Sequence, residues 1–296
     1  MRKNPFASDA GLLTEEELLY IESEIVESVY YQTRARDLFF VKNIGQGGGV
    51  QVHRHYDEEL PSEAQISMTG KAQTDDHPEL TAHDINVPVI SKEFFLNWRD
   101  IASSRRMGES LVNASIRTCT RRIAEAEDRL LISGEYTGWA AEGLEGLFGA
   151  TGRTNTVSVG NWPANAITDI NAGRAALDTA GFVGMAPTMV GPPALIRCLD
   201  AFIANTATTY KQAFLDAGLV SEFVATPNAF AQDGGVDSVV LVMPGKGNFY
   251  AVQDLPLEVN IWYDKVKNVY GTVRETIAPV INHADSIAEV NTIVCA

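Results

Sequence analysis

Three features of this chain of 296 residues predict an α+β fold. An extended apolar segment, 83–95, leads into an amphipathic helix of about two dozen residues that ends before Gly134. Helical and strand-like segments then alternate between residues 165 and 243, and further strand-like segments fill the chain from Tyr250 onward. Helices and strands in this order are expected to pack in layers around an apolar core.

The long helix is predicted from the spacing of its apolar side chains. Residues three and four apart lie on one face of a helix, so a single buried stripe is expected. The stripe consists of Val112, Ile116, Cys119, Ile123, Ala126 and Leu130. The opposite side carries Arg117, Arg121, Arg122, Glu125 and Arg129. Gly134 stands at the expected C-cap, and a helix of this length is about 35 Å long.

The N-terminal part is predicted to hold an arm and one helix. Residues 1–11 have the composition of a loose arm, and Thr14 and Glu17 then form a capping-box pattern that starts a helix over 15–33. The apolar stripe of this helix consists of Leu18, Ile21, Ile25 and Val29, with Leu19 and Val26 beside them. A short strand is predicted to follow over 36–44.

Glycines interrupt the chain directly after this strand. Four of the five residues from Gly45 to Gly49 are glycine, which marks a turn before a second strand over 50–56. The segment lacks the Gly-Lys-Ser/Thr end of a phosphate-binding loop, so no nucleotide site is predicted here. Residues 57–82 are polar and acidic, and connections of this length are typically functional.

Regular elements alternate through the rest of the chain. We predict helices over 165–180 and 192–205, strands over 187–190 and 236–243, and a short connection that includes 211–215. The C-terminal part is predicted to be a series of strands broken by one turn: 250–255, 257–263, the turn 264–268, 269–277, 279–281 and 287–294. Strands therefore dominate this end of the chain.

Composition excludes several classes of protein. Hydrophobic residues make up 45% and charged residues 21%, so the chain is not of the disordered class. No apolar run approaches the roughly 18 residues that a membrane span needs, and the N-terminus lacks the apolar core of a signal peptide. The net charge of −15 argues against general nucleic-acid binding, whereas an acidic wall is compatible with a container that encloses DNA without adhering to it.

The cysteines are few and widely spaced. Cys119, Cys198 and Cys295 are odd in number and fit neither a disulfide framework nor the paired spacing of a zinc site. A reducing compartment is therefore the simplest setting. Cys119 lies on the apolar stripe of the long helix and is expected in the core rather than as a nucleophile.

The order of these segments resembles that of shell proteins of the Hong Kong 97 phage type, a group that includes the major capsid proteins of tailed viruses and the encapsulins. The resemblance rests on the joint between the extended segment and the long helix, where Asn97-Trp98-Arg99-Asp100-Ile101 stands. Further matching motifs are Gly143-Leu144-Glu145-Gly146-Leu147-Phe148, Gln253-Asp254-Leu255, Arg274-Glu275-Thr276 and Asn282. With the N-terminal helix, these motifs cover most of the chain in the same order.

The resemblance implies a capsid fold with five parts. These are an N-terminal arm and helix (1–44), an extended loop (45–90), a peripheral domain with the long spine helix (91–160), an axial domain (161–250) and a return to the peripheral domain (251–296). In this family the extended loop is a two-stranded arm that lies over the neighbouring subunit. In encapsulins the N-terminal helix lines the shell interior and helps to dock cargo.

No catalytic, cofactor or metal site is predicted. His53 and His55 lie on one side of a strand and could hold a metal only with a third ligand such as Asp57, so an exposed histidine pair on an arm is the favoured interpretation. Sequence motifs of serine hydrolases, zinc proteases and dinucleotide-binding enzymes are absent.

Three acids of the long helix, Glu125, Glu127 and Asp128, do not form an acid–base pair in this interpretation, because residues one or two apart do not face each other on a helix. They are predicted to form salt bridges on a solvated or intersubunit face with Arg121, Arg122 and Arg129.

The resemblance also implies two weaker hypotheses. Trp98 stands where some encapsulins stack a flavin on an aromatic residue, although an anchor at the start of a packed helix is the favoured interpretation. Some phage shells join Lys to Asn between subunits, and Lys71 and Asn282 would be the corresponding pair.

The resulting functional hypothesis is a structural subunit that assembles into an icosahedral shell. The segment 96–102, followed by Ser104-Arg105-Arg106 and Gly108, resembles phage relatives more than cargo encapsulins, so the favoured member is the major capsid protein of a tailed virus. Its partners would be itself in pentamers and hexamers, scaffold, portal or decoration proteins, and packaged double-stranded DNA bound without sequence specificity. It would reside in the virion capsid, assembled in the host cytoplasm, with no membrane partner.

Two alternatives stay open. An encapsulin shell would enclose a cargo enzyme, and a groove for cargo beside the helix 15–33 would support it. A small acidic α/β enzyme would instead be a stable monomer or dimer with a concave polar pocket. For the shell hypotheses, no long N-terminal prodomain is expected to be removed.

Overall fold

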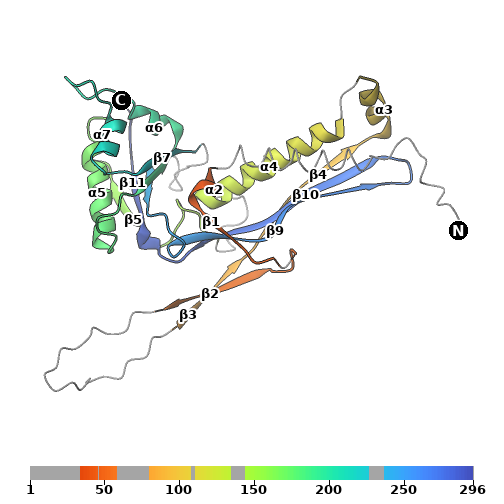
Figure 1. The fold of residues 1–296 in the computed structure, drawn as a ribbon, viewed down its shortest axis with the longest axis horizontal. Coiled ribbons are helices and arrows are strands. Elements are labelled where there is room, and N and C mark those ends of the chain that lie inside the picture. The colour runs from red at the N-terminus through yellow and green to blue at the C-terminus, as the bar shows by residue number, and fades with distance from the viewer. Residues whose placement is uncertain are drawn as a thin grey trace, which may run out of the picture.

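A computed structural model describes residues 34–45, 47–58, 80–107, 111–134, 144–226 and 237–295. The described strands form three sheets (Figure 1). A four-stranded sheet runs beneath the long helix, a five-stranded sheet carries shorter helices at the other end of the molecule, and a two-stranded hairpin projects away from both. The predicted α+β fold class, with its long helix, is confirmed.

The four-stranded sheet has the order β1-β9-β10-β4. Its strands are β1 (Phe40–Asn43), β4 (Val89–Leu96), β9 (Phe249–Tyr263) and β10 (Val269–Ile281). β9 and β10 pair in antiparallel register across the turn 264–268, with irregular register around Thr276. The predicted strands 250–255 and 257–263 are therefore one strand, as are 269–277 and 279–281.

The long helix α4 (Leu111–Ser133) covers one face of this sheet (Figure 1). Val112 and Ile116 pack on Phe94 and on β9 residues, and further along Cys119 and Ile123 pack on Val273. Burying each large aliphatic side chain of the stripe stabilises the contact by about 1.5–3 kcal/mol. The predicted stripe is confirmed except at Ala126, which is half-buried.

Two glycines fix how the chain leaves α4. Gly134 has φ +69°, the left-handed conformation expected at a helix C-cap. A Cβ atom on Gly146 would lie 2.3 Å from the Gly134 nitrogen, so neither position has room for a side chain. The N–H of Phe148 donates to the Ile132 carbonyl at 2.9 Å, which holds the following segment against the last turn of the helix.

The five-stranded sheet has the order β5-β11-β8-β6-β7. Its strands are β5 (Thr154–Val157), β6 (Thr188–Gly191), β7 (Glu222–Ala225), β8 (Val239–Val242) and β11 (Ile287–Asn291). Three helices accompany it: α5 (Ala166–Thr179), α6 (Pro193–Cys198) and α7 (Tyr210–Asp216). Buried residues of the sheet and these helices form one apolar cluster around Trp162 and Phe214.

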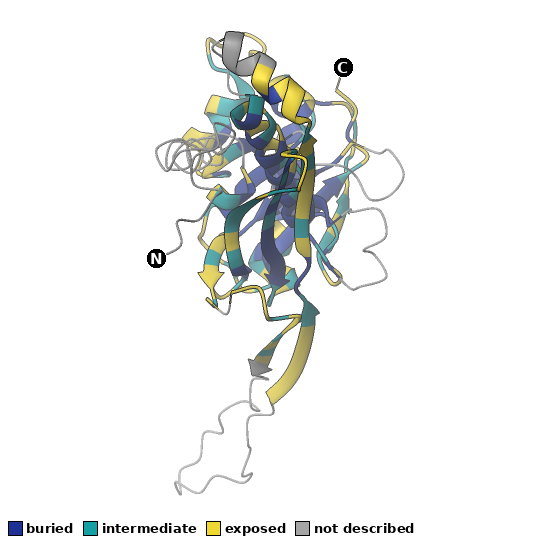
Figure 2. Cartoon of the chain, turned by 90° about the vertical axis from the view of Figure 1, so that its right-hand side faces the viewer, coloured by how far each residue is buried: buried dark blue, intermediate teal, exposed yellow. Residues whose placement is uncertain are grey.

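The hairpin consists of β2 (Val52–Glu58) and β3 (Leu80–Asn86), paired in antiparallel register. Figure 2 shows its strands largely exposed, while buried residues concentrate in the body of the molecule. Two short helices complete the described fold: α2 (Ala35–Leu38) before β1 and α3 (Trp98–Met107) before α4. A 3₁₀ turn, η2 (Ala284–Ser286), precedes β11. None of the helices in the described ranges is long and apolar enough to cross a membrane.

Several predicted elements were wrong in type or extent. The start of the predicted strand 36–44 is the helical turn α2, because Ala35 and Leu38 are buried one turn apart. The predicted helix 192–205 ends at Cys198, and the predicted connection 211–215 lies in helix α7, which Thr209 caps by accepting from the Gln212 N–H. The predicted helix 15–33 lies outside the described residues.

The cysteine prediction was also wrong. Cys198 at the end of α6 and Cys295 near the C-terminus form a disulfide, although they are 97 residues apart in the sequence. The pairing could not be seen in the spacing, because it depends on the fold. Cys198 packs on the apolar cluster that contains Trp162, and Trp162 forms a β-bridge with Cys295. Cys119 is free and buried, as predicted.

The disulfide generates a first prediction. Replacing both partners (C198S/C295S) should lower the free energy of unfolding by about 2–4 kcal/mol, because the bridge closes a long loop of the unfolded chain. Denaturant unfolding with and without a thiol reductant measures this difference. The variant C119S should lose as much stability as the wild type when the reductant is added. If C198S/C295S lost the same amount, the pairing of Cys198 with Cys295 would be contradicted.

Candidate functional site

A buried ionic junction joins the start of the described chain to the long helix and the sheet. The Arg36 guanidinium donates through Nε to Glu127 Oε1 at 2.7 Å and also bonds Glu275 of β10. Both carboxylates are almost fully buried, with 0% and 1% of their side chains exposed, whereas 27% of Arg36 is exposed. Gln253 donates a further hydrogen bond to Glu275 at 2.6 Å. One cation therefore ties α2, α4 and β10 together.

Asp128 forms a second link on the neighbouring position of α4. Its Oδ1 accepts from the Ala35 N–H at 2.8 Å and its Oδ2 accepts from the Thr226 hydroxyl at 3.0 Å. The first of these bonds satisfies a backbone donor at the start of α2, and the second reaches the end of β7. The last turns of α4 thus bind the N-terminal segment, the four-stranded sheet and the five-stranded sheet.

Electrostatics at the junction favour a shared proton. Burial and the nearby Glu275 charge raise the pKa of Glu127 to about 8, even though Arg36 opposes the shift. Burial likewise raises the pKa of Glu275. Two buried carboxylates beside one guanidinium carry one excess negative charge when both are ionised, so a proton on one of them makes the cluster neutral.

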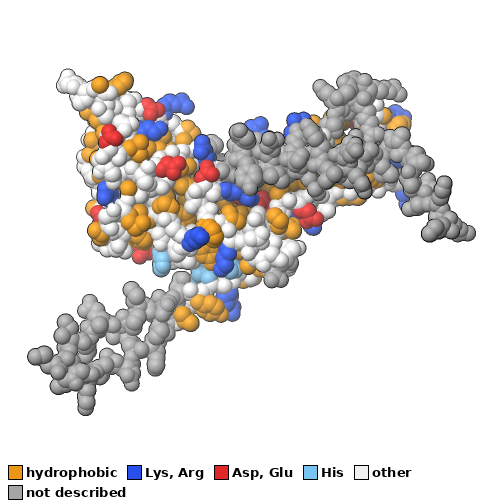
Figure 3. Space-filling model, viewed as in Figure 1, with side chains coloured by type: hydrophobic (Ala, Val, Ile, Leu, Met, Phe, Trp, Pro, Cys, Tyr) orange, Lys and Arg blue, Asp and Glu red, His pale blue; other side chains and the backbone are white. Residues whose placement is uncertain are grey.

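The hairpin meets the body of the molecule at a small joint. The Val50 N–H donates to Asp254 Oδ2 at 2.9 Å, and the Val87 N–H donates to the Gln51 carbonyl at 2.8 Å. His53 Nε2 and the Tyr250 hydroxyl lie 3.3 Å apart in a hydrogen bond. Figure 3 shows pale blue histidine atoms where the hairpin joins the body. Beyond this joint the strands of the hairpin leave the body.

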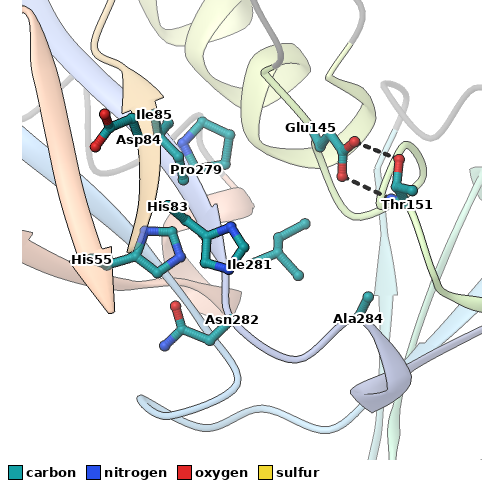
Figure 4. A pocket seen from close by; sticks show the side chains of 10 residues that line it. All are labelled: His55, His83, Asp84, Ile85, Glu145, Thr151, Pro279, Ile281, Asn282 and Ala284. Carbon is teal, nitrogen blue, oxygen red and sulfur yellow. Dashed lines mark hydrogen bonds between the residues drawn. The ribbon is translucent and has the colours of Figure 1, made fainter. Parts of the chain in front are cut away.

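A cleft of about 320 Å³ opens beside the joint (Figure 4). His55 and His83 line it from the hairpin, Ile281 and Asn282 line it from the end of β10, and Glu145 lines it from the segment after α4. Glu145 is engaged with Thr151, whose N–H and hydroxyl both donate to its carboxylate. The cleft thus separates the hairpin from the body.

An exposed row of aromatic rings crosses the other face of the four-stranded sheet. Trp262 and Tyr270 stack with their centroids 6.0 Å apart, and Phe95 lies 4.9 Å from Tyr270. Because side chains alternate along a strand, these residues point away from α4, on which Phe94 and Ile261 pack. Trp262 is 46% and Phe95 53% exposed. Such an apolar surface is typical of a protein–protein contact.

The structure separates the acids that the sequence grouped together. Glu125 pairs with Arg121 at 3.0 Å and with Arg122 at 2.8 Å on the exposed side of α4, as predicted. The prediction that Glu127 and Asp128 lie on a solvated or intersubunit face was wrong, because both are buried within the chain, Glu127 against Arg36 and Asp128 against Ala35 and Thr226. The signal that could have located the junction is Glu275, which lies on the same face of its strand as the buried Val269 and Val273 and therefore requires a buried partner.

The structure gives the positions of the histidines and the tryptophan singled out in the sequence. His53 and His55 do lie on one side of β2, with ring centroids 6.4 Å apart. Among the residues that the structure describes, no cluster of three metal-ligating side chains occurs, and the Asp57 side chain lies outside the described ones. Trp98 is 44% exposed, with Arg99 over its ring, and its backbone N–H donates to Asn268 Oδ1 at 3.2 Å. Both interpretations of Trp98 stay predictions.

The proposed crosslinking pair is only half described. Asn282 lies in the cleft, where its Nδ2 donates to the Gly247 carbonyl at 3.0 Å. Lys71 lies outside the described residues, and the Lys71–Asn282 pairing stays a prediction. The domain boundaries also stay predictions.

Comparison with known families identifies the chain. A family model described as the encapsulating protein for peroxidase matches residues 13–249. The chain belongs to this family. The chain is 30% identical, over 116 residues, to the type 1 encapsulin shell protein EncA of Myxococcus xanthus (strain DK1622). That match spans 39% of this chain and 39% of the relative, so it covers well under half the length of either protein.

Solved structures show the same fold as this encapsulin-family chain. The virus-like particle of Pyrococcus furiosus superposes with a TM-score of 0.67 at 12% identity, over 94% of this chain and 100% of that one. The capsid of Myoviridae phage XM1 gives 0.69 at 13% identity, over 88% and 91%. The holo-SrpI encapsulin complex of Synechococcus elongatus PCC 7942 gives 0.58 at 11% identity, over 90% of this chain and 89% of that one. The predicted Hong Kong 97 phage-type fold is confirmed.

The junction generates a second prediction. Arg36→Met should lower the free energy of unfolding by about 2–4 kcal/mol, because it leaves two buried carboxylates without their cation. Denaturant unfolding of the full chain measures the effect. Arg34→Met is the matched control, since Arg34 pairs with Asp37 at an exposed site and the loss of that pair should cost no more than about 0.5 kcal/mol. Equal losses in the two variants would contradict the role of Arg36.

A third prediction concerns pH. The pKa of Glu127 is higher in the folded chain, about 8, than its ordinary value of 4.5. The stability that its protonated form contributes is therefore complete below the ordinary pKa and is lost as the pH rises through the folded pKa, with a slope of at most about 1.4 kcal/mol per pH unit. Melting temperatures measured between pH 4.5 and about pH 8 should therefore fall as the pH rises, and Glu127→Gln should make this fall smaller. Glu125→Gln, on the exposed side of the helix, should leave it unchanged.

Proposed function

We propose that the chain is the shell subunit of an encapsulin-type compartment, an icosahedral container that encloses a protein cargo. The observation that carries the proposal is the family match over residues 13–249. The similarity to EncA supports it, since that relative is a type 1 encapsulin shell protein. The family description supports a peroxidase as the class of cargo.

The viral alternative keeps one observation in its favour. The TM-score to the phage XM1 capsid, 0.69, is higher than the 0.58 to the holo-SrpI encapsulin complex. Because that similarity is at 13% identity, it supports the fold that phage capsids and encapsulins share and not the contents of the shell. A tailed-virus capsid, with packaged double-stranded DNA and scaffold, portal or decoration proteins, is therefore the second candidate, and the virion location belongs to it.

The surface of the described chain supports assembly. An exposed aromatic row and a hairpin that extends beyond the body both present surface that a lone subunit leaves in water. Val52, Tyr56 and Leu80 add apolar area on the hairpin, with 48%, 60% and 65% of each residue exposed. Exposed apolar surface of this extent is expected to be covered by other copies of the chain.

Electron microscopy of the purified chain tests the proposal. We expect closed hollow polyhedra, and particles isolated from the native host should contain a protein cargo by mass spectrometry and show little nucleic-acid absorbance. Particles filled with DNA would select the viral alternative. A monodisperse species near the chain mass of 32.2 kDa under several salt conditions would overturn both and favour the enzyme hypothesis.

A fourth prediction concerns the aromatic row. The variant F95S/W262S should abolish or greatly weaken assembly while the chain stays folded, because the rings are exposed in the subunit and removal opens no core cavity. Analytical ultracentrifugation gives the assembly state, and circular dichroism checks the fold. The variant F95Y/W262F retains aromatic rings and should assemble, and normal shells from F95S/W262S would show that the row lies outside the subunit contacts.

A further inference from the structure

The joint between hairpin and body concentrates histidines. Three of the five histidines of the chain, His53, His55 and His83, lie there side by side. The rings of His53 and His55 are 6.4 Å apart and inclined by 15°, and those of His55 and His83 are 5.4 Å apart and inclined by 24°. His83 faces His55 across the paired strands β2 and β3. The three rings therefore form one continuous stack, the histidine stack.

One end of the histidine stack contacts the body. His53 Nε2 and the Tyr250 hydroxyl share a hydrogen bond, and the His53 ring meets the Tyr250 ring edge-on at 6.3 Å. Lys42 Nζ lies 5.4 Å from the centroid of the Tyr250 ring. The other end of the stack, His55 and His83, lines the cleft beside Asn282 (Figure 4).

The charged groups around the stack come from every element that packs there. Lys42 on β1 is a cation close to His53, and Arg54 on β2 is a second cation that holds both oxygens of Asp84 on β3 at 2.7 Å. Glu145 after α4 accepts from Thr151, and Asp254 on β9 accepts from the Val50 N–H. Asp84 also interacts electrostatically with His55, whereas Glu145 and Asp254 accept from Thr151 and Val50. Repulsion on protonation therefore acts mainly at His53, through His55 and Lys42.

The segment that leads into the hairpin contains two glycines in the left-handed conformation. Gly47 and Gly48 have φ of +71° and +85°, and a Cβ atom on Gly47 would meet nothing within 4 Å. Residues with such φ values are usually glycine, and the space around Gly47 is open, whereas Val50, Ile85 and Val87 at the base of the hairpin pack with Leu130 and Ala278 of the body. The hairpin is therefore held on this side mainly by the contacts at its base.

From this arrangement we propose that the histidine stack is a pH-dependent latch, which holds the hairpin against the body while its rings are neutral and releases it when they are protonated. Neutral imidazoles stack without electrostatic penalty. When protonated, the rings place positive charges beside one another and beside Lys42, and charges of one sign at this separation repel.

The direction of the pKa of His53 agrees with the latch. Burial, together with the charges of Lys42 and His55, lowers the pKa of His53 from its ordinary value of 6.5. The released hairpin therefore binds protons more strongly than the latched one. The latch contributes its full stabilisation above the ordinary histidine pKa, and this contribution is lost as the pH falls through the lowered pKa of the latched state.

Hydrogen exchange on the full chain tests the latch. Protection of residues 52–58 and 80–86, corrected for the intrinsic pH dependence of exchange and compared with β9 and β10 in the same molecules, should fall about fivefold or more between about pH 7.5 and about pH 5.5. In H53N/H55N/H83N this pH dependence should disappear. His283→Asn, which alters an exposed histidine outside the stack, should keep the wild-type behaviour.

A second variant keeps the test decisive if the triple variant fails to fold. Lys42→Met removes a cation that lowers the pKa of His53, so the pKa of the latched state should move closer to its ordinary value and acidification should cause a smaller loss of protection than in the wild type. Unchanged wild-type protection across this pH range, or an equal loss in H53N/H55N/H83N, would overturn the proposal. Light scattering at each pH gives the assembly state, so a failure to form shells is read separately from the movement of the hairpin.

Discussion

The ionic junction around Arg36 is the contact on which the arrangement of the other elements depends. A buried pair of carboxylates is costly by itself, and the guanidinium of Arg36 compensates for that cost only when α2 lies against α4 and β10 at the same time. Glu127 and Asp128, adjacent on α4, therefore orient three separate parts of the chain: the N-terminal segment, the four-stranded sheet and the end of β7. Apolar packing supplies most of the stability of these contacts, whereas the charges select this one arrangement.

The two sides of helix α4 also differ in polarity. Its apolar stripe lies on the four-stranded sheet, and Arg121, Arg122 and Glu125 remain on the outside. The opposite face of that sheet carries the exposed aromatic row, and the hairpin leaves the body at the far end of β9 and β10 from this row. A shell subunit needs both properties: a core that is stable in the single chain, and apolar surface that is satisfied only among neighbours.

Much of this fold was accessible from the sequence because it depends on local periodicity. The three-and-four spacing from Val112 to Leu130 predicts α4, and Gly134 predicts its end. The order of motifs predicts the capsid fold. The candidate site was less accessible, because its partners are distant in sequence: Arg36 and Glu275 are 239 residues apart, and Cys198 and Cys295 are 97 apart. Periodicity places Glu127 beside exposed arginines of its own helix and does not reveal a cation that arrives from another element.

The contact between Gly134 and Gly146 has a meaning for the dimensions of a shell. These residues set the direction in which the backbone passes from the spine helix towards the five-stranded sheet, and the absence of side chains lets the two backbones touch. In a closed lattice each subunit repeats the same internal angle, so a deviation of a few degrees accumulates around the particle and alters its curvature. Two residues that bear no functional group therefore fix an internal angle of the subunit, and the radius and enclosed volume of such a container depend on that angle.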